Sequence, residues 1–545
     1  MTAPVSDNSA PRGEPWVWFT GLGLIVGLGM VVGLLGLVVL NGVTVFWAPP
    51  VPVAQLDDGR AIIGQLAQRR IRPGSPADQP RYELQYQVGL RELNGNSYLW
   101  VDESRIKSET FPTDLLGLER VENGPAFVRP VSLRRSDGKV VVATDPSFEA
   151  VFQSEVAAAA VIRERLVEIT RHRIGEVNRA MDQSRVALRR AEDLKLAAEA
   201  DELRKQIAGL EGRFSALQGE AKRVAEGGAV ASLVSKDAAN REVVMPLSQV
   251  IRGWFPNRLD TWGRLRLFGD RLGEFVFDEP REANTEGGLM PAIFGTLVMT
   301  VFMSLMVTPF GVITAIYLRE YAQQGPLLRI VRISVNNLAG VPSIVFGVFG
   351  LGFFVYVLGG SIDQLFFADQ LKYNNNTPVF GTGGLLWCSL TLALMTLPVV
   401  IVATEEALAA VPRGMREASL ATGASKWQTI RDILLPASAP GILTGVILAM
   451  ARGAGEVAPL MLVGVVKLAP TLPFDGAAPF LHLDRKFMHL GFHVYDLGFQ
   501  SPDSDAARPM VFATTLLLIL LVVCLNLGAI WIRNRLRARF KGASF

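Results

Sequence analysis

The chain has 545 residues, of which 50% are hydrophobic and 19% charged, and its mean hydropathy is +0.29. So apolar a composition excludes an ordinary soluble enzyme and indicates a membrane protein. The formal net charge of +3 is too small to predict nucleic-acid binding. Cys388 and Cys524 both lie in apolar runs, so we expect neither a disulfide framework nor a cysteine metal site.

Six apolar stretches are long enough to cross a membrane, which takes roughly 20 residues. They cover residues 16–46, 291–318, 335–358, 384–404, 441–466 and 510–532. The first run, assigned to a helix over 16–48, is longer than the apolar part of a secretion signal, and no small-residue cleavage site follows it. We interpret it as a retained anchor, so six spans place both chain ends on the same side.

Lysine and arginine predict the orientation, because short cytoplasmic loops carry an excess of both. Such residues follow spans two, four and six: Arg319, Arg329, Arg332; Arg413, Arg416, Lys426, Arg431; Arg533, Arg535, Arg537, Arg539, Lys541. The loop between spans three and four holds only Lys372, whereas the last outer loop, with Lys467, Arg485, Lys486 and Arg508, reduces the contrast. We predict a bacterial inner-membrane protein with a cytoplasmic N-terminus (1–15) and a basic cytoplasmic tail (536–545).

Residues 49–288 separate the first two spans and would lie in the periplasm on this topology. Alternating residues at 82–88, and a turn at 136–139 before a β-branched run, predict a β-rich part over 51–146. Residues 147–227 contain no proline and predict helices. A coiled-coil seam is indicated by the spacing of Leu203, Ile207, Leu210, Phe214, Leu217, Ala221 and Val224.

The coiled coil leaves two questions open at this point. A loss of register at 195–200 fits a hairpin or a stutter in one long helix. The helices can serve as a docking or sensing arm for a periplasmic partner, or as a structural spacer. A catalytic centre is not expected, because the insert has no cysteine and only one histidine, His172.

The loop over residues 405–436 combines small residues, a glycine and a proline in an ordered spacing. Small residues from Ala418 to Ala424 let a short amphipathic helix lie close to another protein, Gly423 allows a tight turn, and Pro436 favours the start of the next helix. This loop resembles the EAA loop of ABC importer permeases, whose pattern is filled by Glu417, Ala418, Gly423, Leu435 and Pro436, with Ser419 in place of the second alanine.

The resemblance implies that this loop docks in a cleft of a separate ATPase subunit, with Arg413, Arg416 and Lys426 contributing polar contacts beside Glu417. A solvated basic loop would account for the charges but not for the spacing. The chain itself has no G-x-x-x-x-G-K-[ST] motif to cradle nucleotide phosphates. We therefore expect no cofactor on this chain, and ATP and Mg²⁺ on the partner ATPase.

Three further segments, at residues 286–296, 337–350 and 451–460, resemble phosphate permeases, and Ala-Pro-Leu at 458–460 resembles the PstA type more than the PstC type. The resemblance implies a six-helix type I ABC importer permease fold, all-α in its core over 289–535, with the α+β insert outside. It also implies the partners: a PstC-type permease, a PstB-type ATPase homodimer and a PstS-type periplasmic phosphate-binding protein.

Arg452 and Glu456 are four residues apart in the fifth predicted span, so on a helix they share one face and can pair. An ionisable pair inside a membrane span tends to face a pathway or a partner helix. Arginine offers planar donors that suit phosphate, and the carboxylate can hold the guanidinium in place. The resemblance implies a role in phosphate passage, whereas an internal salt bridge is the structural alternative.

Two other functions and one other site stay open. A permease for molybdate or sulfate would keep the EAA-like loop but not the phosphate-permease segments, and a membrane-anchored sensor or scaffold would leave the spans unexplained. His489 and His493, with His482 nearby, have a spacing that can bind a metal on a helix. A polar outer loop explains them more simply, so we predict no metal site.

Overall fold

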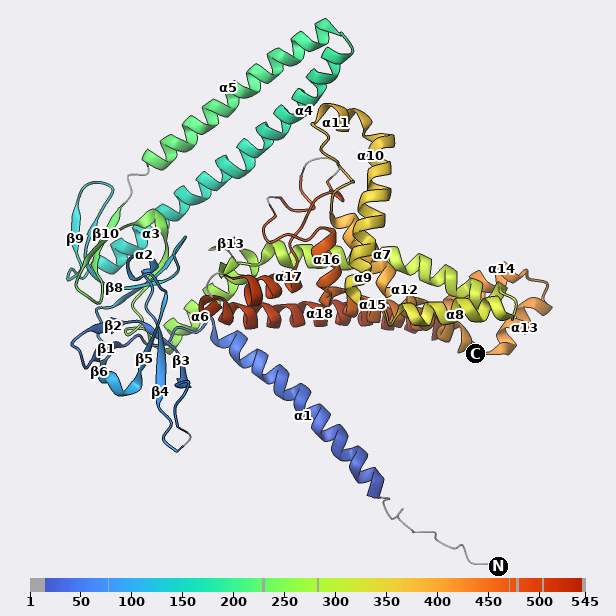
Figure 1. The fold of residues 1–545 in the computed structure, drawn as a ribbon, viewed down its shortest axis with the longest axis horizontal. Helices are drawn as coiled ribbons and strands as arrows, with labels where there is room; N and C mark the ends of the chain where they lie inside the picture. Colours follow the sequence, from blue (N-terminus) through green and yellow to red (C-terminus); the bar gives the residue numbers. More distant parts are fainter. Residues whose placement is uncertain are drawn as a thin grey trace, which may run out of the picture.

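The computed structural model describes residues 15–76, 78–227, 231–281, 284–469, 471–476, 480–501 and 504–541. The predictions for residues 1–14 and for 542–545 at the end of the basic tail lie outside these ranges. A helical bundle carries a strand-rich insert at one end, and a long pair of helices rises from the insert above the bundle (Figure 1).

Within the described ranges, six helices are long and apolar enough to span a membrane. They are α1 (Pro15–Thr44); α7 (Met290–Ile316) with η5 (Tyr317–Tyr321); α9 (Ser343–Phe349) with η6 (Gly350–Gly359) and α10 (Gly360–Phe366); α12 (Leu385–Ala409); α14 (Lys426–Thr429) with η7 (Ile430–Leu434) and α15 (Leu435–Gly455); and α18 (Ser504–Lys541). The six predicted spans are confirmed in number, and the limits of the third and fifth differ most from those predicted.

The third and fifth spans begin and end at other residues than predicted. Residue 335 lies in a separate helix, α8 (Pro326–Leu338), and the third span starts only at Ser343, after Pro342. The fifth span starts at Lys426 and ends at Gly455. A short helix, α16 (Ala458–Val463), follows the break. Apolar residues continue through both breaks, which is why composition alone placed the limits wrongly.

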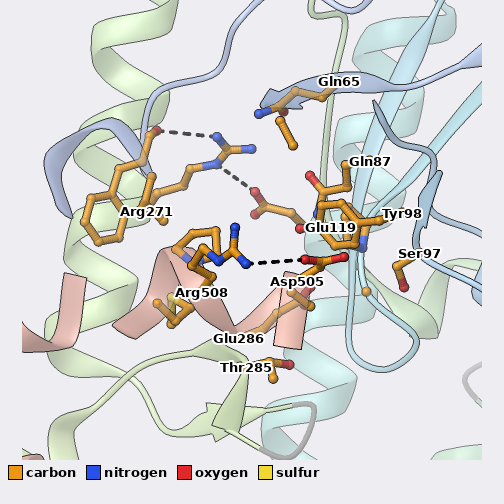
Figure 2. A pocket seen from close by; sticks show the side chains of 18 of the residues that line it. Gln65, Gln87, Ser97, Tyr98, Glu119, Arg271, Thr285, Glu286, Asp505 and Arg508 are labelled. Carbon is orange, nitrogen blue, oxygen red and sulfur yellow. Dashed lines mark hydrogen bonds and ion pairs between the residues drawn. The ribbon is translucent and has the colours of Figure 1, made fainter. Parts of the chain in front are cut away.

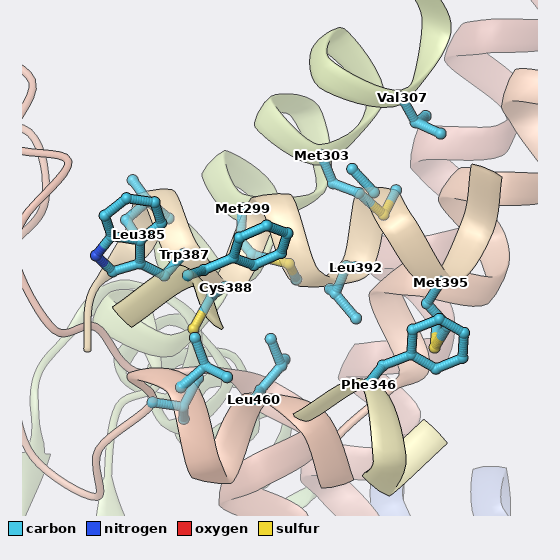
Figure 3. Packing of buried hydrophobic residues seen from close by; sticks show 14 of the residues in the cluster. Met299, Met303, Val307, Phe346, Leu385, Trp387, Cys388, Leu392, Met395 and Leu460 are labelled. Atoms are coloured by element: carbon cyan, nitrogen blue, oxygen red, sulfur yellow. The ribbon is translucent and has the colours of Figure 1, made fainter. Parts of the chain in front are cut away.

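The core of the bundle lies where α7, α12 and α15 pack against the third span and α16. Figure 3 shows the buried methionines of α7, Met299 and Met303, beside Leu392 and Met395 of α12 and Phe346 of α9. Small residues bring α12 and α15 close: a Cβ on Gly445 would lie 2.4 Å from that of Ala403. Such contacts let helices associate closely in a membrane.

The insert is built from antiparallel strands. The strands and short helices before the long helices are β1 (Val53–Leu56), β2 (Ala61–Ile63), β3 (Gln65–Ile71), β4 (Tyr82–Gln87), α2 (Arg91–Asn94), β5 (Tyr98–Asp102), η1 (Glu103–Arg105), β6 (Ile106–Thr110), β7 (Leu116–Arg120), β8 (Ala126–Arg134) and β9 (Val140–Val142). Three strands follow the long helices: β10 (Ser232–Lys236), β11 (Glu242–Pro246) and β12 (Val250–Trp254), with η3 (Leu247–Gln249) between the last two. These three strands follow residue 146, where the sequence pattern predicted none.

The strands form three larger sheets with the orders β2-β1-β6, β3-β4-β5 and β11-β10-β8-β7-β12, and β9 pairs with β8. In the last sheet β10 lies against β8, with Leu233 opposite Leu133, so the chain returns to the same sheet after the helices. Helix α3 (Phe148–Val167) covers this sheet through Phe148 and Phe152, which are buried with both leucines.

The long helices form a hairpin, which we call the arm. It consists of η2 (Glu168–Arg173), α4 (Ile174–Asp193) and α5 (Ala197–Gly227), and the chain reverses at Lys195, whose φ is +56°. The arm's ion pairs, Arg173–Glu220, Arg185–Glu211 and Arg204–Glu192, show that α4 and α5 are antiparallel. Residues of the predicted seam, including Leu210 and Leu217, pack against Val177 and Met181 of α4.

The arm touches the outer loops of the bundle. Near its tip, Asp193 binds Lys372 and accepts a hydrogen bond of 2.6 Å from the hydroxyl of Tyr373, both in α11 (Ala368–Tyr373). Arg189 donates to the carbonyl of Tyr373 at 2.8 Å, and Arg179 lies 3.5 Å from Asp475 in the loop after the fifth span. The arm therefore connects the strands of the insert to α11, which follows the third span (Figure 1).

The insert rejoins the bundle through α6 (Thr261–Phe277) and a small ribbon, β13 (Pro280–Arg281) with β14 (Glu286–Gly287). Asp260 caps α6, because its carboxylate accepts from the amide of Gly263 at 2.8 Å. Phe275 of α6 is buried against Phe46, just after α1, and against α17 (Leu490–Tyr495), η8 (Asp496–Gln500) and α18. The segment that enters the insert after α1 thus packs against the helix that leads out of it.

Candidate functional site

The EAA-like loop folds as a short exposed helix between α12 and the fifth span. This helix, α13 (Arg413–Ala421), has no buried residue, and Met415 and Leu420 are each almost half exposed. Arg413, Glu417 and Ala418 are also exposed. Among the described residues, neither Arg413 nor Glu417 has an ion pair, so α13 presents unpaired charges and apolar side chains together.

The turn after α13 uses the predicted glycine. Gly423 has a φ of +86°, a left-handed conformation that favours glycine, and its amide donates to the carbonyl of Leu420 at 3.0 Å. Ser425 then caps the next helix, and a 2.9 Å hydrogen bond between the hydroxyls of Ser419 and Thr429 ties α13 to it. Ser419 therefore stabilises the loop.

Leu435 and Pro436 lie inside a helical segment, whereas the sequence predicted that a helix would start near Pro436. They open α15, but the helical segment already starts at Lys426 and passes through the π-helical turn η7. Because proline has no N–H, it fits where a π turn has already interrupted the regular hydrogen bonds. Pro436 thus marks the change from π to α geometry, not the start of the helix.

Arg416 and Lys426 contact this chain rather than project freely. The Arg416 guanidinium lies 2.9 Å from the carboxylate of Glu320, whose side chain is only 7% exposed. Lys426 lies over the ring of Tyr321, with 4.9 Å between its amine and the ring centroid. Sequence reasoning missed Glu320 and Tyr321, and the available signal was an acidic residue directly after Arg319, just past the inner end of a predicted span. Both missed residues connect the end of span two to the α13 loop.

The candidate pathway residues lie at the break in the fifth span. Arg452 is in the last turn of α15, and Glu456 ends that helix with an extended backbone (φ −79°, ψ 135°). The prediction that both residues share one face of a continuous helix is therefore wrong, because the helix stops at Gly455. They still form an ion pair, with 3.7 Å between Arg452 Nε and Glu456 Oε1.

The break brings together two of the segments that resemble phosphate permeases. Pro459 in α16 lies against Gly347 of α9, where a Cβ on the glycine would come within 2.7 Å of the proline Cα. Gly453 lies equally close to Met303 of α7, whose sulfur would be 2.4 Å from such a Cβ. Non-helical backbone at membrane depth is tolerated where protein surrounds it or where it lines a cavity.

The Arg452 guanidinium keeps most of its donors available. Its side chain is 38% exposed and that of Glu456 is 23% exposed. Within the described part of the chain, Arg452 makes no side-chain hydrogen bond, and its one ion pair is longer than a hydrogen bond. An arginine has five N–H donors, so this arrangement can bind an oxyanion while Glu456 holds the guanidinium in place.

The predicted histidine pair lies in a buried polar cluster between α7, α17 and α18. His489, His493 and Asp496 are each at most 2% exposed, and Lys467 lies 2.9 Å from the Asp496 carboxylate. His489 caps α17 by accepting from the amide of Gly491 at 3.1 Å. The described ranges hold no group of three metal-ligating side chains. The cap gives His489 a structural place at the start of α17.

These histidines should make the fold sensitive to acid. Burial lowers the pKa of both His489 and His493 to about 4, from an ordinary value of 6.5. Between these values the unfolded chain binds protons that the folded chain excludes, so stability is complete above pH 6.5 and falls as the pH approaches 4. The loss is roughly 3 kcal/mol per histidine.

His493→Gln is expected to reduce this pH dependence, measured as the unfolding temperature of the purified protein in lipid nanodiscs between pH 7 and pH 4. The matched control is His172→Gln, which changes an exposed imidazole in the arm. An unchanged slope in His493→Gln would show that another group causes the acid sensitivity.

Comparison with known proteins bears on all of these sites. Residues 307–541 match the family model described as "Binding-protein-dependent transport system inner membrane component". The chain is 41% identical over 228 residues to the phosphate transport system permease protein PstA of Mycobacterium leprae, covering 42% of this chain and 64% of that protein. It is 31% identical over 246 residues to PstA of Haemophilus influenzae, covering 45% and 75%.

The chain thus spans less than two thirds of the length of the Mycobacterium leprae protein. Among solved structures, an inward-facing MetNI methionine ABC transporter covers 46% of this chain and 95% of its own, at 21% identity and a TM-score of 0.34.

Proposed function

Because the chain belongs to the family of binding-protein-dependent transport system inner membrane components and is of the PstA type, we propose that it is a permease subunit of an ATP-driven phosphate importer. The observation that carries this proposal is the Arg452–Glu456 pair at the break of the fifth span, with donors available for an oxyanion. The close approach of α16 to α9 at this break supports a pathway built from the segments that resemble phosphate permeases.

The proposed partners follow from the same reasoning. A PstC-type permease would complete the pathway, a PstB-type ATPase homodimer would bind ATP and Mg²⁺, and a PstS-type protein would deliver phosphate. We place α13 in a cleft of the ATPase, because its exposed apolar and charged side chains are suited to a protein contact. This chain would then bind no cofactor of its own.

For the topology, we propose an inner-membrane protein with both ends in the cytoplasm and residues 49–288 in the periplasm. In support, α8, α13 and the last described turns of α18 lie at one end of the bundle and the strand-rich insert at the other (Figure 1). Loading of the binding protein outside and closure of the ATPase inside would act on opposite ends of the same helices.

We also propose that the arm is a structural spacer. Its contacts with α11 and with Asp475 tie the insert to the outer loops of this same chain. In a docking or sensing arm, the side chains of Asp193, Arg189 and Arg179 would be available to another protein instead of binding this chain.

The test is uptake of radiolabelled phosphate into proteoliposomes that contain this chain, its co-purified partners and the binding protein. We expect ATP-dependent uptake that excess sulfate or molybdate does not compete away. Uptake of radiolabelled sulfate or molybdate without phosphate uptake would favour the other-oxyanion permease, and assembly without any transport would favour a sensor or scaffold.

A further inference from the structure

A cavity of about 650 Å³ lies where the insert meets the outer ends of α1 and α18. Figure 2 shows its polar wall, with Gln65 and Gln87 from the sheet on one side and Arg271 and Arg508 on the other. It lies apart from the pathway residues and from α13, and the proposed transport function assigns it no role.

Four glutamines share one face of the β3–β4 pair and line this cavity. Gln65 lies opposite Gln87 and Gln68 opposite Gln85, and the pairing shifts by one residue between them. Cross-strand partners point to the same face, and residues two apart on β4 do so as well. The extra residue in β3 is a bulge that places Gln68 on the same side as Gln65.

Two buried donors in the cavity wall have no partner in the described structure. Gln85 is 3% exposed and its Nε2 is unpaired, and Trp254 is 8% exposed with an unpaired Nε1. An unsatisfied buried donor costs roughly 1–3 kcal/mol, so such groups normally have a ligand, a water or a protein partner.

The carboxylates of Glu119, Glu274 and Asp505 in the wall each lie near an arginine. Glu119 pairs with Arg271 at 2.7 Å, and Glu274 pairs with Arg252 at the same distance. Asp505 lies 3.9 Å from Arg508 at the rim, and this guanidinium also donates to Gln68 at 3.2 Å. The donors of Gln85 and Trp254 remain to be satisfied. A fitting ligand carries several hydrogen-bond acceptors.

One part of the cavity lies beside the end of α1 and the first turns of α18, which are both spanning helices. Thr44 and Phe46 from α1 and the turn after it, and Phe512 from α18, line it below the polar wall. Helix α6 next to it exposes Trp262, which is 74% exposed, and Leu265 on one side. Exposed aromatic and aliphatic residues beside helix ends are typical of a membrane interface.

We propose that this cavity binds the headgroup of an outer-leaflet phospholipid that is anionic and carries hydroxyl groups, with its acyl chains beside α1 and α18. Gln85 and Trp254 donate to headgroup oxygens, and the other glutamines hydrogen-bond the hydroxyls. Arg508 donates to the phosphate in place of its 3.9 Å contact with Asp505. Such a lipid would join the insert to the membrane, which goes beyond the proposed transport function.

The probe is dioctanoyl phosphatidylglycerol, titrated into the full assembly after lipid removal by detergent exchange. Native mass spectrometry counts the bound lipid, and the unfolding temperature gives its dissociation constant. Dioctanoyl phosphatidylcholine and inorganic phosphate are titrated in separate arms. We expect one phosphatidylglycerol per chain, bound at least tenfold more tightly than phosphatidylcholine. Any protection by inorganic phosphate should come from the transport pathway and should not depend on Gln85 and Trp254.

Gln85→Leu combined with Trp254→Phe should weaken phosphatidylglycerol binding at least tenfold, whereas Gln218→Leu, on the exposed side of α5, should leave it unchanged. Because Gln85 and Trp254 are buried, Arg508→Gln at the rim provides a second variant with little risk to the fold. Equal binding of the two lipids, unaffected by these variants, would overturn the proposal. Protection by inorganic phosphate that the Gln85→Leu, Trp254→Phe variant abolishes would assign the site to a free anion.

Discussion

Arg452→Gln is expected to lower ATP-dependent phosphate uptake at least tenfold while assembly with the partner chains survives. The guanidinium of Arg452 has donors available, and hydrogen bonds from a charged donor to an oxyanion contribute about 1.5–3 kcal/mol. Losing them in the pathway corresponds to a reduction of roughly ten- to a hundredfold. The measurement is initial uptake in proteoliposomes, with Arg213→Gln on the exposed face of α5 as the matched control.

Two further variants separate a transport role from a structural salt bridge. Arg452→Lys keeps the charge but loses the planar donors, so it should recover only part of the uptake. If the pair only stabilises the fold, Arg452→Gln combined with Glu456→Gln should restore both stability and uptake, because no unpaired charge remains. If Arg452 contacts phosphate, the double variant stays inactive. Normal uptake in Arg452→Gln would show that Arg452 does not contribute to phosphate passage.

Glu417→Lys is expected to abolish the coupling of ATP hydrolysis to uptake. Glu417 is exposed on a helix with no buried residue, so reversing its charge should leave the fold intact and disturb only a contact with another protein. We expect uptake to fall at least tenfold and the ATPase rate to stop responding to loaded binding protein. Both rates are measured in the same proteoliposomes.

The matched control for this change is Glu202→Lys, an exposed glutamate on the arm. Co-purification of the ATPase distinguishes lost docking from lost coupling, since either result places Glu417 at the interface. Normal uptake and normal ATPase stimulation in Glu417→Lys would show that α13 contacts the ATPase elsewhere, or not at all.

The sequence predicted the spans because an apolar run long enough to cross a membrane is a local property. It could not predict the break after Gly455, since Val457 to Val466 continue the apolar composition through it. Gly455 and Pro459 flank the break and were the available signal. The same holds at Pro342, where an amphipathic helix precedes the third span.

Non-local contacts explain most of what the sequence missed. The pairing of β10 with β8 joins residues about a hundred positions apart, and no local pattern records it. Arg416 was predicted from its place in the loop, but its partner Glu320 comes from another span. The glutamines of the cavity look ordinary along the chain and share a face only because of a bulge in β3.

The length of the antiparallel arm sets the distance between the sheet of the insert and the outer loops of the bundle. Both of its ends stay at the sheet, so removing about seven residues from each helix would leave the base unchanged and move the tip by about 10 Å. The contacts of Asp193 with α11 hold only at one length, since a shorter or longer hairpin would miss Lys372 and Tyr373. Evolution could therefore adjust the height of the insert above the outer loops in whole heptads, without altering a residue in the membrane.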